Sequence, residues 1–348
     1  MTAELIRRLR REDVFDPAPR REDLAAVHVP FDELTDTTRV EAAVRRAIDA
    51  ADRIGVVGPS GSGKSSVLAW CCNPLEPEIA PIVIPASVEP DEVLTRPPAF
   101  AQHVLRQLAR NAGPLAQPER DRLLRDSTDR MSLPTRQRRR AITLPSILGR
   151  TPALAHEVVE LTAQVDHPRS GIDVVDLLSD ALRLFDAHRL QPVLVIDDTD
   201  HWLEGGGDRA HLIAPFFGPV LRMLNELPAC VLVAVHDRYL TDARYQASPG
   251  FLTSLAFIPR LERLEAIEQI LTRRLVAHHH DQRSPAPPLA EVVDGDALQL
   301  LAEFYLGPAT PSLRRLLRVA HRALDRATGA DHAIVTEADL RAAIGDDR

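Results

Sequence analysis

Residues 58–65 have the types and spacing of a phosphate-binding loop. They match the pattern G-x-x-x-x-G-K-[ST] and read Gly58-Pro59-Ser60-Gly61-Ser62-Gly63-Lys64-Ser65. Glycines let the backbone turn tightly and direct its N–H groups at phosphate oxygens, and the following helix adds the positive end of its dipole. We expect Lys64 to reach the β- and γ-phosphates of ATP and Ser65 to ligate Mg²⁺, with Ser66 at the edge of the same nucleotide site. Lys64 is the one lysine among 42 lysines and arginines.

A pair of acids follows an apolar run at residues 192–196. A continuous apolar run is typical of a buried parallel strand, and ligands of open α/β sheets lie beyond the carboxyl ends of such strands. We expect Asp197 to bind Mg²⁺, directly or through water, and Asp198 to orient or activate the attacking water. The alternative is a core strand that ends in a solvated acidic turn.

Other apolar runs predict the strands that position these residues. The phosphate-binding loop follows residues 53–57, and further strands are expected at 81–85, 230–235 and 256–258. A helix is expected from Thr38 to about Ala50, and residues after 259 are helical in pattern. Leu313, Leu316, Leu317 and Ala320 have the i, i+3, i+4, i+7 spacing of one helix face.

The order of phosphate-loop strand, intervening strand and acid-terminated strand resembles the additional-strand P-loop ATPases, which include AAA+ and STAND proteins. Among these, the motifs of this sequence are most similar to those of the origin-recognition, initiator-like AAA+ ATPases. The run "VIDDTD" at residues 195–200 also resembles KAP-type ATPases. The resemblance implies an α/β fold with a parallel P-loop sheet and an all-helical lid. It also implies that Val29-Pro30-Phe31 flanks the adenine.

Two further parts of the site are implied by this resemblance alone. The strand at 230–235 is similar to the sensor 1 strand, whose polar tip would be His236 or Asp237. The run at 312–317 resembles the sensor 2 helix, in which an arginine reaches the γ-phosphate. Arg314 is the better match and Arg315 the second, and the alternative is a solvated arginine face. The catalytic residues implied are therefore Lys64, Asp198 and Arg314.

The chain divides into three expected parts. Residues 1–35 form an N-terminal extension, residues 36–258 an ATPase core, and residues 259–348 a helical lid. The separation of Lys64 from Asp197 is longer than a minimal AAA+ core needs, so the resemblance implies a helical insertion at about 113–170, bounded and broken by glycine and proline. The insertion carries the run Arg136, Arg138, Arg139 and Arg140. This run would contact DNA phosphates or an acidic protein partner; a solvated helix or loop explains it equally well.

Composition excludes several classes of protein. The chain has 348 residues, 45% of them hydrophobic, and a net charge of −8, so a basic surface that binds nucleic acid everywhere is excluded. No apolar run is long enough to span a bilayer, so no membrane partner is expected. The cysteines are Cys71, Cys72 and Cys230, an odd number with two adjacent, which argues against a disulfide framework and for a reducing cytoplasm.

Three hypotheses for function remain from the sequence. The first is an AAA+ ATPase that forms a homo-oligomer and acts with DNA or a DNA-processing partner. The second is a STAND- or KAP-like switch that controls a protein partner in signalling or defence, and the third is an ATP-binding scaffold. AAA+ proteins usually receive an arginine finger from a neighbouring subunit, but residues 250–255 contain no arginine. Arg238, Arg244 and Arg260 are the nearby candidates, so slow hydrolysis without a partner is expected.

Overall fold

The computed structural model describes most of the chain. Described are residues 3–36, 39–73, 78–111, 115–128, 171–203, 209–248, 252, 254–279, 285–307 and 311–347. The arginine run of the predicted insertion, from Arg136 to Arg140, lies outside these residues. Within them, no helix is both long and apolar enough to cross a membrane.

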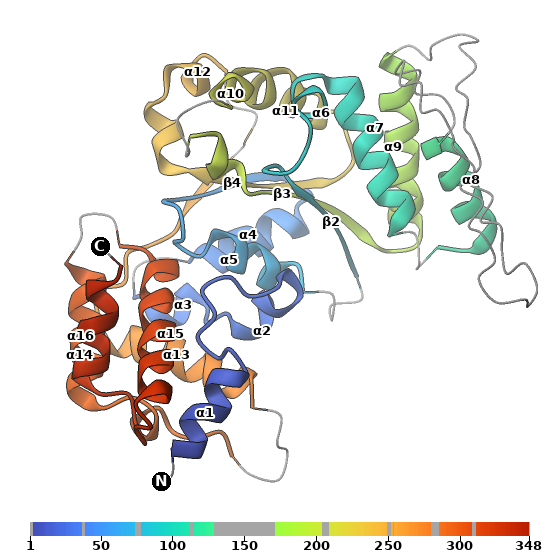
Figure 1. Ribbon diagram of the computed structural model, residues 1–348. Coiled ribbons are helices and arrows are strands. Elements are labelled where there is room, and N and C mark those ends of the chain that lie inside the picture. Colours follow the sequence, from blue (N-terminus) through green and yellow to red (C-terminus); the bar gives the residue numbers. More distant parts are fainter. Residues whose placement is uncertain are drawn as a thin grey trace, which may run out of the picture.

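The centre of the molecule is a five-stranded sheet in which every pairing is parallel (Figure 1). Its order is β2-β3-β4-β1-β5, with strands at Ile79–Pro85, Gln191–Asp197, Cys230–His236, Arg53–Gly58 and Ser254–Phe257. The predicted α/β class with a parallel sheet is confirmed. Strand β4 separates β1 from β3, so the phosphate-binding loop and the acidic pair emerge two strands apart at one edge.

Alternating side chains divide the sheet between two cores. Ile54 and Val56 of β1 face one core, whereas Val57 faces the other, as period-two side chains must. The first core lies beneath α4 and α5 and continues into the C-terminal helices. The second lies beneath α7, α9, α10 and α11. Both faces of β1, β3 and β4 are therefore covered, as the continuous apolar runs predicted.

Helices at the start of the chain and around the sheet have the following bounds: α1 Ala3–Arg11, α2 Leu24–Val27, α3 Phe31–Leu34, α4 Val40–Asp49, α5 Lys64–Cys71, α6 Asp91–Thr95, α7 Pro97–Arg110, α8 Gln117–Thr128, α9 Gly171–Ala187, α10 Ile213–Pro215, α11 Leu221–Leu224 and α12 Ala243–Gln246. The C-terminal group comprises α13 Leu264–Ala277, α14 Gly295–Leu306, α15 Leu313–Gly329 and α16 Glu337–Gly345. Helix α1 packs against α15, so the first and last parts of the chain lie side by side (Figure 1).

A buried carboxylate fixes the N-terminal segment to the core. Glu41 of α4 accepts hydrogen bonds from the amides of Phe31 (2.9 Å) and Asp32 (3.3 Å), and its Oε1 lies 2.9 Å from Nε2 of His28. Burial raises the pKa of Glu41, but the hydrogen bonds with His28 and the Phe31 amide outweigh it and leave the pKa below its usual value. Glu41 therefore holds Phe31 in place, and the Phe31 ring packs close to Gly63 of the phosphate-binding loop.

Replacing this carboxylate should destabilise the protein. We expect Glu41→Ala to lower the free energy of unfolding by about 3 kcal/mol, because it leaves two amides and His28 without their buried acceptor. Denaturant unfolding at neutral pH measures the loss. Since the pKa of Glu41 is depressed, its contribution is present above the ordinary glutamate pKa and disappears as pH falls through the folded-state value.

Glu33→Ala is the matched control, because Glu33 lies on α3 beside Phe31 but is exposed. An equal, small effect of both substitutions would show that Glu41 is not the anchor of this segment.

Candidate nucleotide-binding site

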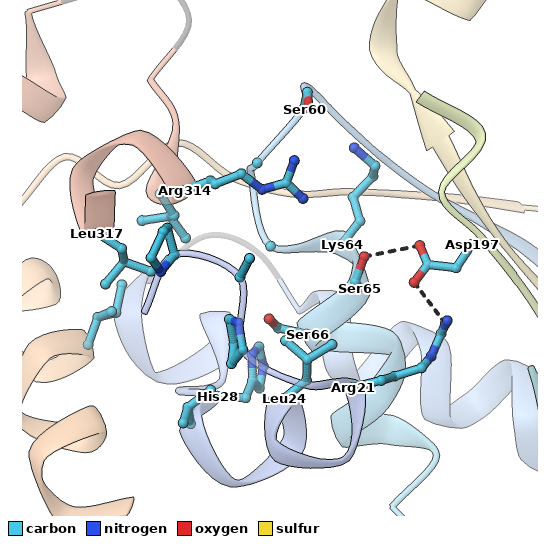
Figure 2. A pocket seen from close by; sticks show the side chains of 18 of the residues that line it. Arg21, Leu24, His28, Ser60, Lys64, Ser65, Ser66, Asp197, Arg314 and Leu317 are labelled. Atoms are coloured by element: carbon cyan, nitrogen blue, oxygen red, sulfur yellow. Dashed lines mark hydrogen bonds and ion pairs between the residues drawn. The ribbon is translucent and has the colours of Figure 1, made fainter. Parts of the chain in front are cut away.

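One cavity of about 290 Å³ lies where the core, the C-terminal helices and the N-terminal segment meet (Figure 2). One end is polar and is lined by Ser60, Gly61, Gly63, Lys64, Ser65, Ser66, Asp197, Asp198 and Asp200. The other end is largely apolar and is lined by Leu24, Val27, His28, Val29, Phe31, Leu34, Ile270, Leu313 and Leu317. Val29 and Phe31, which the resemblance places beside the adenine, are at this apolar end. A polar pole joined to an apolar pole suits a nucleotide, which has phosphates at one end and a base at the other.

The phosphate-binding loop has a backbone that its glycines make possible. Gly61 and Gly63 have φ of 71° and 108°, which residues with a Cβ rarely adopt. A Cβ on Gly61 would also lie 2.5 Å from Oγ of Ser312 and 2.8 Å from Cβ of Arg314. Gly61 therefore allows both the turn of the loop and the close approach of the helix α15 terminus.

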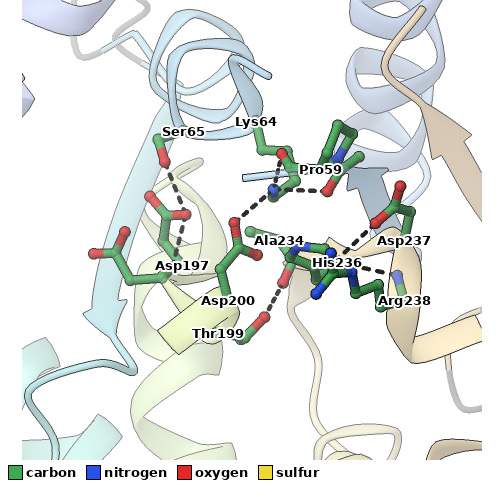
Figure 3. A network of polar contacts seen from close by, with 12 residues as sticks. Pro59, Lys64, Ser65, Asp197, Thr199, Asp200, Ala234, His236, Asp237 and Arg238 are labelled. Carbon is green, nitrogen blue, oxygen red and sulfur yellow. Dashed lines mark hydrogen bonds and ion pairs between the residues drawn. The ribbon is translucent and has the colours of Figure 1, made fainter. Parts of the chain in front are cut away.

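Lys64 is buried and donates three hydrogen bonds (Figure 3). Its Nζ lies 2.8 Å from the carbonyl of Gly58, 2.9 Å from that of Pro59 and 2.8 Å from Oδ2 of Asp200. An ammonium group has three donors, so all of them are occupied. A bound phosphate must therefore replace at least one of these acceptors.

Asp200 was not identified from the sequence as a site residue. It lies in the short 3₁₀ helix Thr199–Trp202 directly after β3, and its distance in sequence from Lys64 gives no local signal. The available clue was its position three residues after Asp197, because one helical turn brings such residues to the same side.

Ser65 and Asp197 face each other across the loop (Figures 2 and 3). The Ser65 hydroxyl donates to Oδ1 of Asp197 at 3.1 Å, and the Asp197 side chain is only 3% exposed. A hydroxyl and a carboxylate at this separation are the hard oxygen ligands that Mg²⁺ prefers. The residues present therefore fit the ion expected from the sequence.

Asp198, which lines the cavity, has an unusual backbone conformation. Its φ of 61° and ψ of 29° are left-handed, a strained conformation for a residue other than glycine. Burial raises the pKa of Asp198, and the neighbouring Asp197 carboxylate raises it further. The turn thus separates two adjacent acids that both line the cavity but have different surroundings.

The two candidate sensor 2 arginines have different positions. The backbone N–H of Arg314 donates to the carbonyl of Gly61 at 3.1 Å, and the Arg314 side chain lines the cavity (Figure 2). Arg315 turns away from it, with Nε 2.6 Å from Oδ2 of Asp347. Of these two arginines, only Arg314 therefore lines the cavity.

His236 and Asp237, the candidate sensor 1 tip, lie beside the loop but do not line the cavity. Nδ1 of His236 accepts a hydrogen bond from the amide of Arg238 at 3.1 Å and lies 2.8 Å from Oδ1 of Asp237 (Figure 3). Next to them, the Tyr239 hydroxyl donates to the Thr199 carbonyl at 2.6 Å, and the Thr199 hydroxyl donates to the Ala234 carbonyl at 2.6 Å. These bonds join the segment after β3 to β4 itself and to the segment after β4.

Three arginines of the described residues line the cavity: Arg21, Arg274 and Arg314. Nη2 of Arg21 lies 2.8 Å from Oδ2 of Asp197, and burial lowers the pKa of Arg274 to about 10. Neither was singled out from the sequence, because both lie in segments rich in other charged residues. The finger candidates Arg238, Arg244 and Arg260 are exposed and are not among the lining residues.

Removing the charge of Asp200 should strengthen nucleotide binding. We expect Asp200→Asn to lower the dissociation constant for ATP about fivefold, because Asp200 competes with phosphate for Lys64 and repels it. Titration with a fluorescent ATP analogue measures the change. Asp198→Asn is the control, since it removes a nearby charge that does not touch Lys64; equal tightening by both would contradict a specific role for Asp200.

Several solved structures are similar to this chain. Among solved structures, the chain is similar to the ADP form of the ORC2 protein of Aeropyrum pernix, with 14% identity, a TM-score of 0.49, and 88% of this chain and 67% of that chain covered. It is also similar to CDC6P from Pyrobaculum aerophilum, with 13% identity, a TM-score of 0.48, and coverages of 90% and 68%. A third is Drosophila ORC bound to DNA, with 14% identity, a TM-score of 0.45, and coverages of 95% and 67%.

A search of curated proteins found no match. The sequence model of the AAA ATPase domain, however, matches residues 35–210, which is half of the chain and contains both the phosphate-binding loop and the acidic pair. The chain therefore belongs to the AAA ATPase domain family.

Proposed function

We propose that this protein binds ATP with Mg²⁺, hydrolyses it, forms a homo-oligomer and acts with DNA or a DNA-processing partner. The observation that carries the proposal is the meeting of Lys64, Ser65, Asp197 and Arg314 at the polar end of one cavity. Phosphoryl transfer depends mainly on positioning and charge neutralisation, and these side chains supply both.

Each residue has a distinct role in this proposal. The loop amides and Lys64 would hold the phosphates, and Ser65 and Asp197 would hold Mg²⁺, which neutralises charge on the phosphates when bound. Asp198, which lines the same cavity, would orient the attacking water. Arg314 would contact the γ-phosphate from the lid, which we propose comprises residues 259–348 beside a core at 36–258.

The exposure of the finger candidates supports oligomer formation. An arginine that completes a neighbour's site has to be exposed and remote from its own cavity. Arg238, Arg244 and Arg260 are all exposed. The first two lie in the segments after β4, Asp237–Thr241 and Ala243–Gln246. We propose that hydrolysis is slow until such a residue from a second subunit reaches the site.

DNA is proposed as the partner because the arginine run at residues 136–140 is a local positive charge on an acidic protein. A contact of this kind would be directed at the phosphate backbone rather than at bases. We propose a cytoplasmic location, because three cysteines, two of them adjacent, do not suit a disulfide framework.

A second candidate function is a nucleotide-dependent switch. The observation that favours it is the closed, internally paired site: Asp200 holds Lys64, and the Arg314 amide is bonded to the phosphate-binding loop. A protein in this state would use nucleotide exchange, rather than continuous turnover, to control a protein partner.

ATP hydrolysis with and without duplex DNA tests the main proposal. We expect phosphate release that DNA stimulates, and Lys64→Ala should abolish it because the phosphates lose their buried cation. Slow turnover that ignores DNA would instead support the switch. Absence of nucleotide binding by the wild-type protein would contradict both functions.

A mixing experiment tests the oligomer. Alanine at the true finger among Arg238, Arg244 and Arg260 should lower kcat about 10³-fold, since a finger contributes at least that much. Mixing that variant with Asp198→Asn should restore part of the activity, because one interface then combines an intact water-orienting acid with an intact finger. If no mixture of variants regains activity, no site is shared between subunits.

A further inference from the structure

An arginine of the N-terminal segment already neutralises the acid assigned to Mg²⁺. Nη2 of Arg21 lies 2.8 Å from Oδ2 of Asp197 (Figure 2). The other oxygen, Oδ1, accepts hydrogen bonds from the Ser65 hydroxyl at 3.1 Å and from the Asp198 amide at 2.9 Å. Both carboxylate oxygens of Asp197 therefore have partners, and one of the partners is a full positive charge.

The pairing has a clear electrostatic reason. The Asp197 side chain is 3% exposed, and a carboxylate removed from water is costly unless an opposite charge or a metal accompanies it. The Arg21 guanidinium supplies that opposite charge in this structure. Mg²⁺ would neutralise the same carboxylate, and the two cations are alternatives for one buried negative charge.

The surrounding segment keeps Arg21 at this position. Arg21 begins the 3₁₀ helix Arg21–Asp23, which continues into α2, and α2 packs against both α5 of the core and α13 of the C-terminal group. Upstream, Ile6 and Leu9 of α1 are buried in the same core as α15. Arg10 also forms an ion pair with Asp325 of α15, and Arg7 forms one with Asp331 just after that helix. The segment that carries Arg21 is therefore held on both sides, and Arg21 needs little ordering to reach Asp197.

We propose that Arg21 competes with Mg²⁺ for Asp197. In the absence of Mg²⁺, Arg21 shields nucleotide phosphates from the Asp197 charge and so supports nucleotide binding. When Mg²⁺ accompanies the nucleotide, the Arg21–Asp197 pair opposes the entry of Mg²⁺. Arg21 thereby reduces the dependence of nucleotide binding on Mg²⁺. The inference rests on the proposed binding of nucleotide and Mg²⁺ at this site.

The measured quantity is the ratio of nucleotide dissociation constants in EDTA and in Mg²⁺. In Arg21→Ala we expect this ratio to rise about tenfold, since binding weakens without Mg²⁺ and is unchanged or tighter with it. Fluorescence titration of the full chain with labelled ADP and ATP gives both constants without requiring hydrolysis. Arg21→Lys should give an intermediate ratio, because it keeps the charge and loses the planar geometry.

Two controls separate this effect from general loss of charge or fold. Arg20→Ala removes the exposed neighbouring arginine and should leave the ratio unchanged. In an Asp197→Asn background, Arg21→Ala should no longer raise the ratio, since the charge for which the two cations compete is absent. Thermal unfolding of each variant verifies that the fold is retained.

Other outcomes would overturn the inference. An unchanged ratio in Arg21→Ala would mean that Arg21 and Mg²⁺ act independently. A smaller ratio would mean that Arg21 assists the Mg²⁺-bound nucleotide, as an arginine finger does. If the wild-type protein binds no nucleotide in either buffer, the proposed function is wrong and this inference is overturned with it.

Discussion

The buried carboxylate of Asp197 is the charge on which the arrangement of the site depends. It stands at the end of β3, whose side chains are buried on both faces, so little water reaches it. An acid in that position needs partners from the protein, and each partner comes from a different part of the chain: Ser65 from α5, the Asp198 amide from the following turn, and Arg21 from the N-terminal segment. Satisfying one charge therefore brings three segments together.

The strand order determines which residues can meet. Because β4 lies between β1 and β3, the loop after β1 reaches the acids across the end of β4. Two buried hydrogen bonds hold the acidic turn against that strand. The Tyr239 hydroxyl donates to the Thr199 carbonyl, and the Thr199 hydroxyl donates to the Ala234 carbonyl. This position of the turn brings Oδ2 of Asp200 to 2.8 Å from Nζ of Lys64. A cation with a full set of protein acceptors is stable before any ligand arrives, and nucleotide binding becomes an exchange of partners.

The parts predicted from the sequence are those whose signal is local. The apolar runs at 53–57, 192–196 and 230–235 predicted strands because both faces of a central parallel strand are buried, and the glycines predicted the loop because they permit positive φ. Asp200 and Arg21 could not be found this way, because their partners are 136 and 176 residues away. Arg314 and Arg315 are neighbours on one helix, so the sequence does not show which of them faces the cavity. The hydrogen bond from the Arg314 amide to the Gly61 carbonyl fixes the rotation of the helix and so decides it.

Apolar packing, rather than surface charge, holds the N-terminal segment against the C-terminal helices. The side chains of Arg7 and Asp331 are more than half exposed, so their ion pair contributes about 1 kcal/mol at most. Ile6 and Leu9 of α1 are buried in the same core as the α15 residues Leu316 and Ala320, and each buried aliphatic side chain contributes about 1.5–3 kcal/mol. The same core includes Phe31 and the faces of β1 and β3. The C-terminal helices, the N-terminal segment and the sheet are therefore one packed unit around the cavity, so a displacement of those helices would disturb the segment that carries Arg21. The apolar core and the charge on Asp197 thus hold the same segment in place.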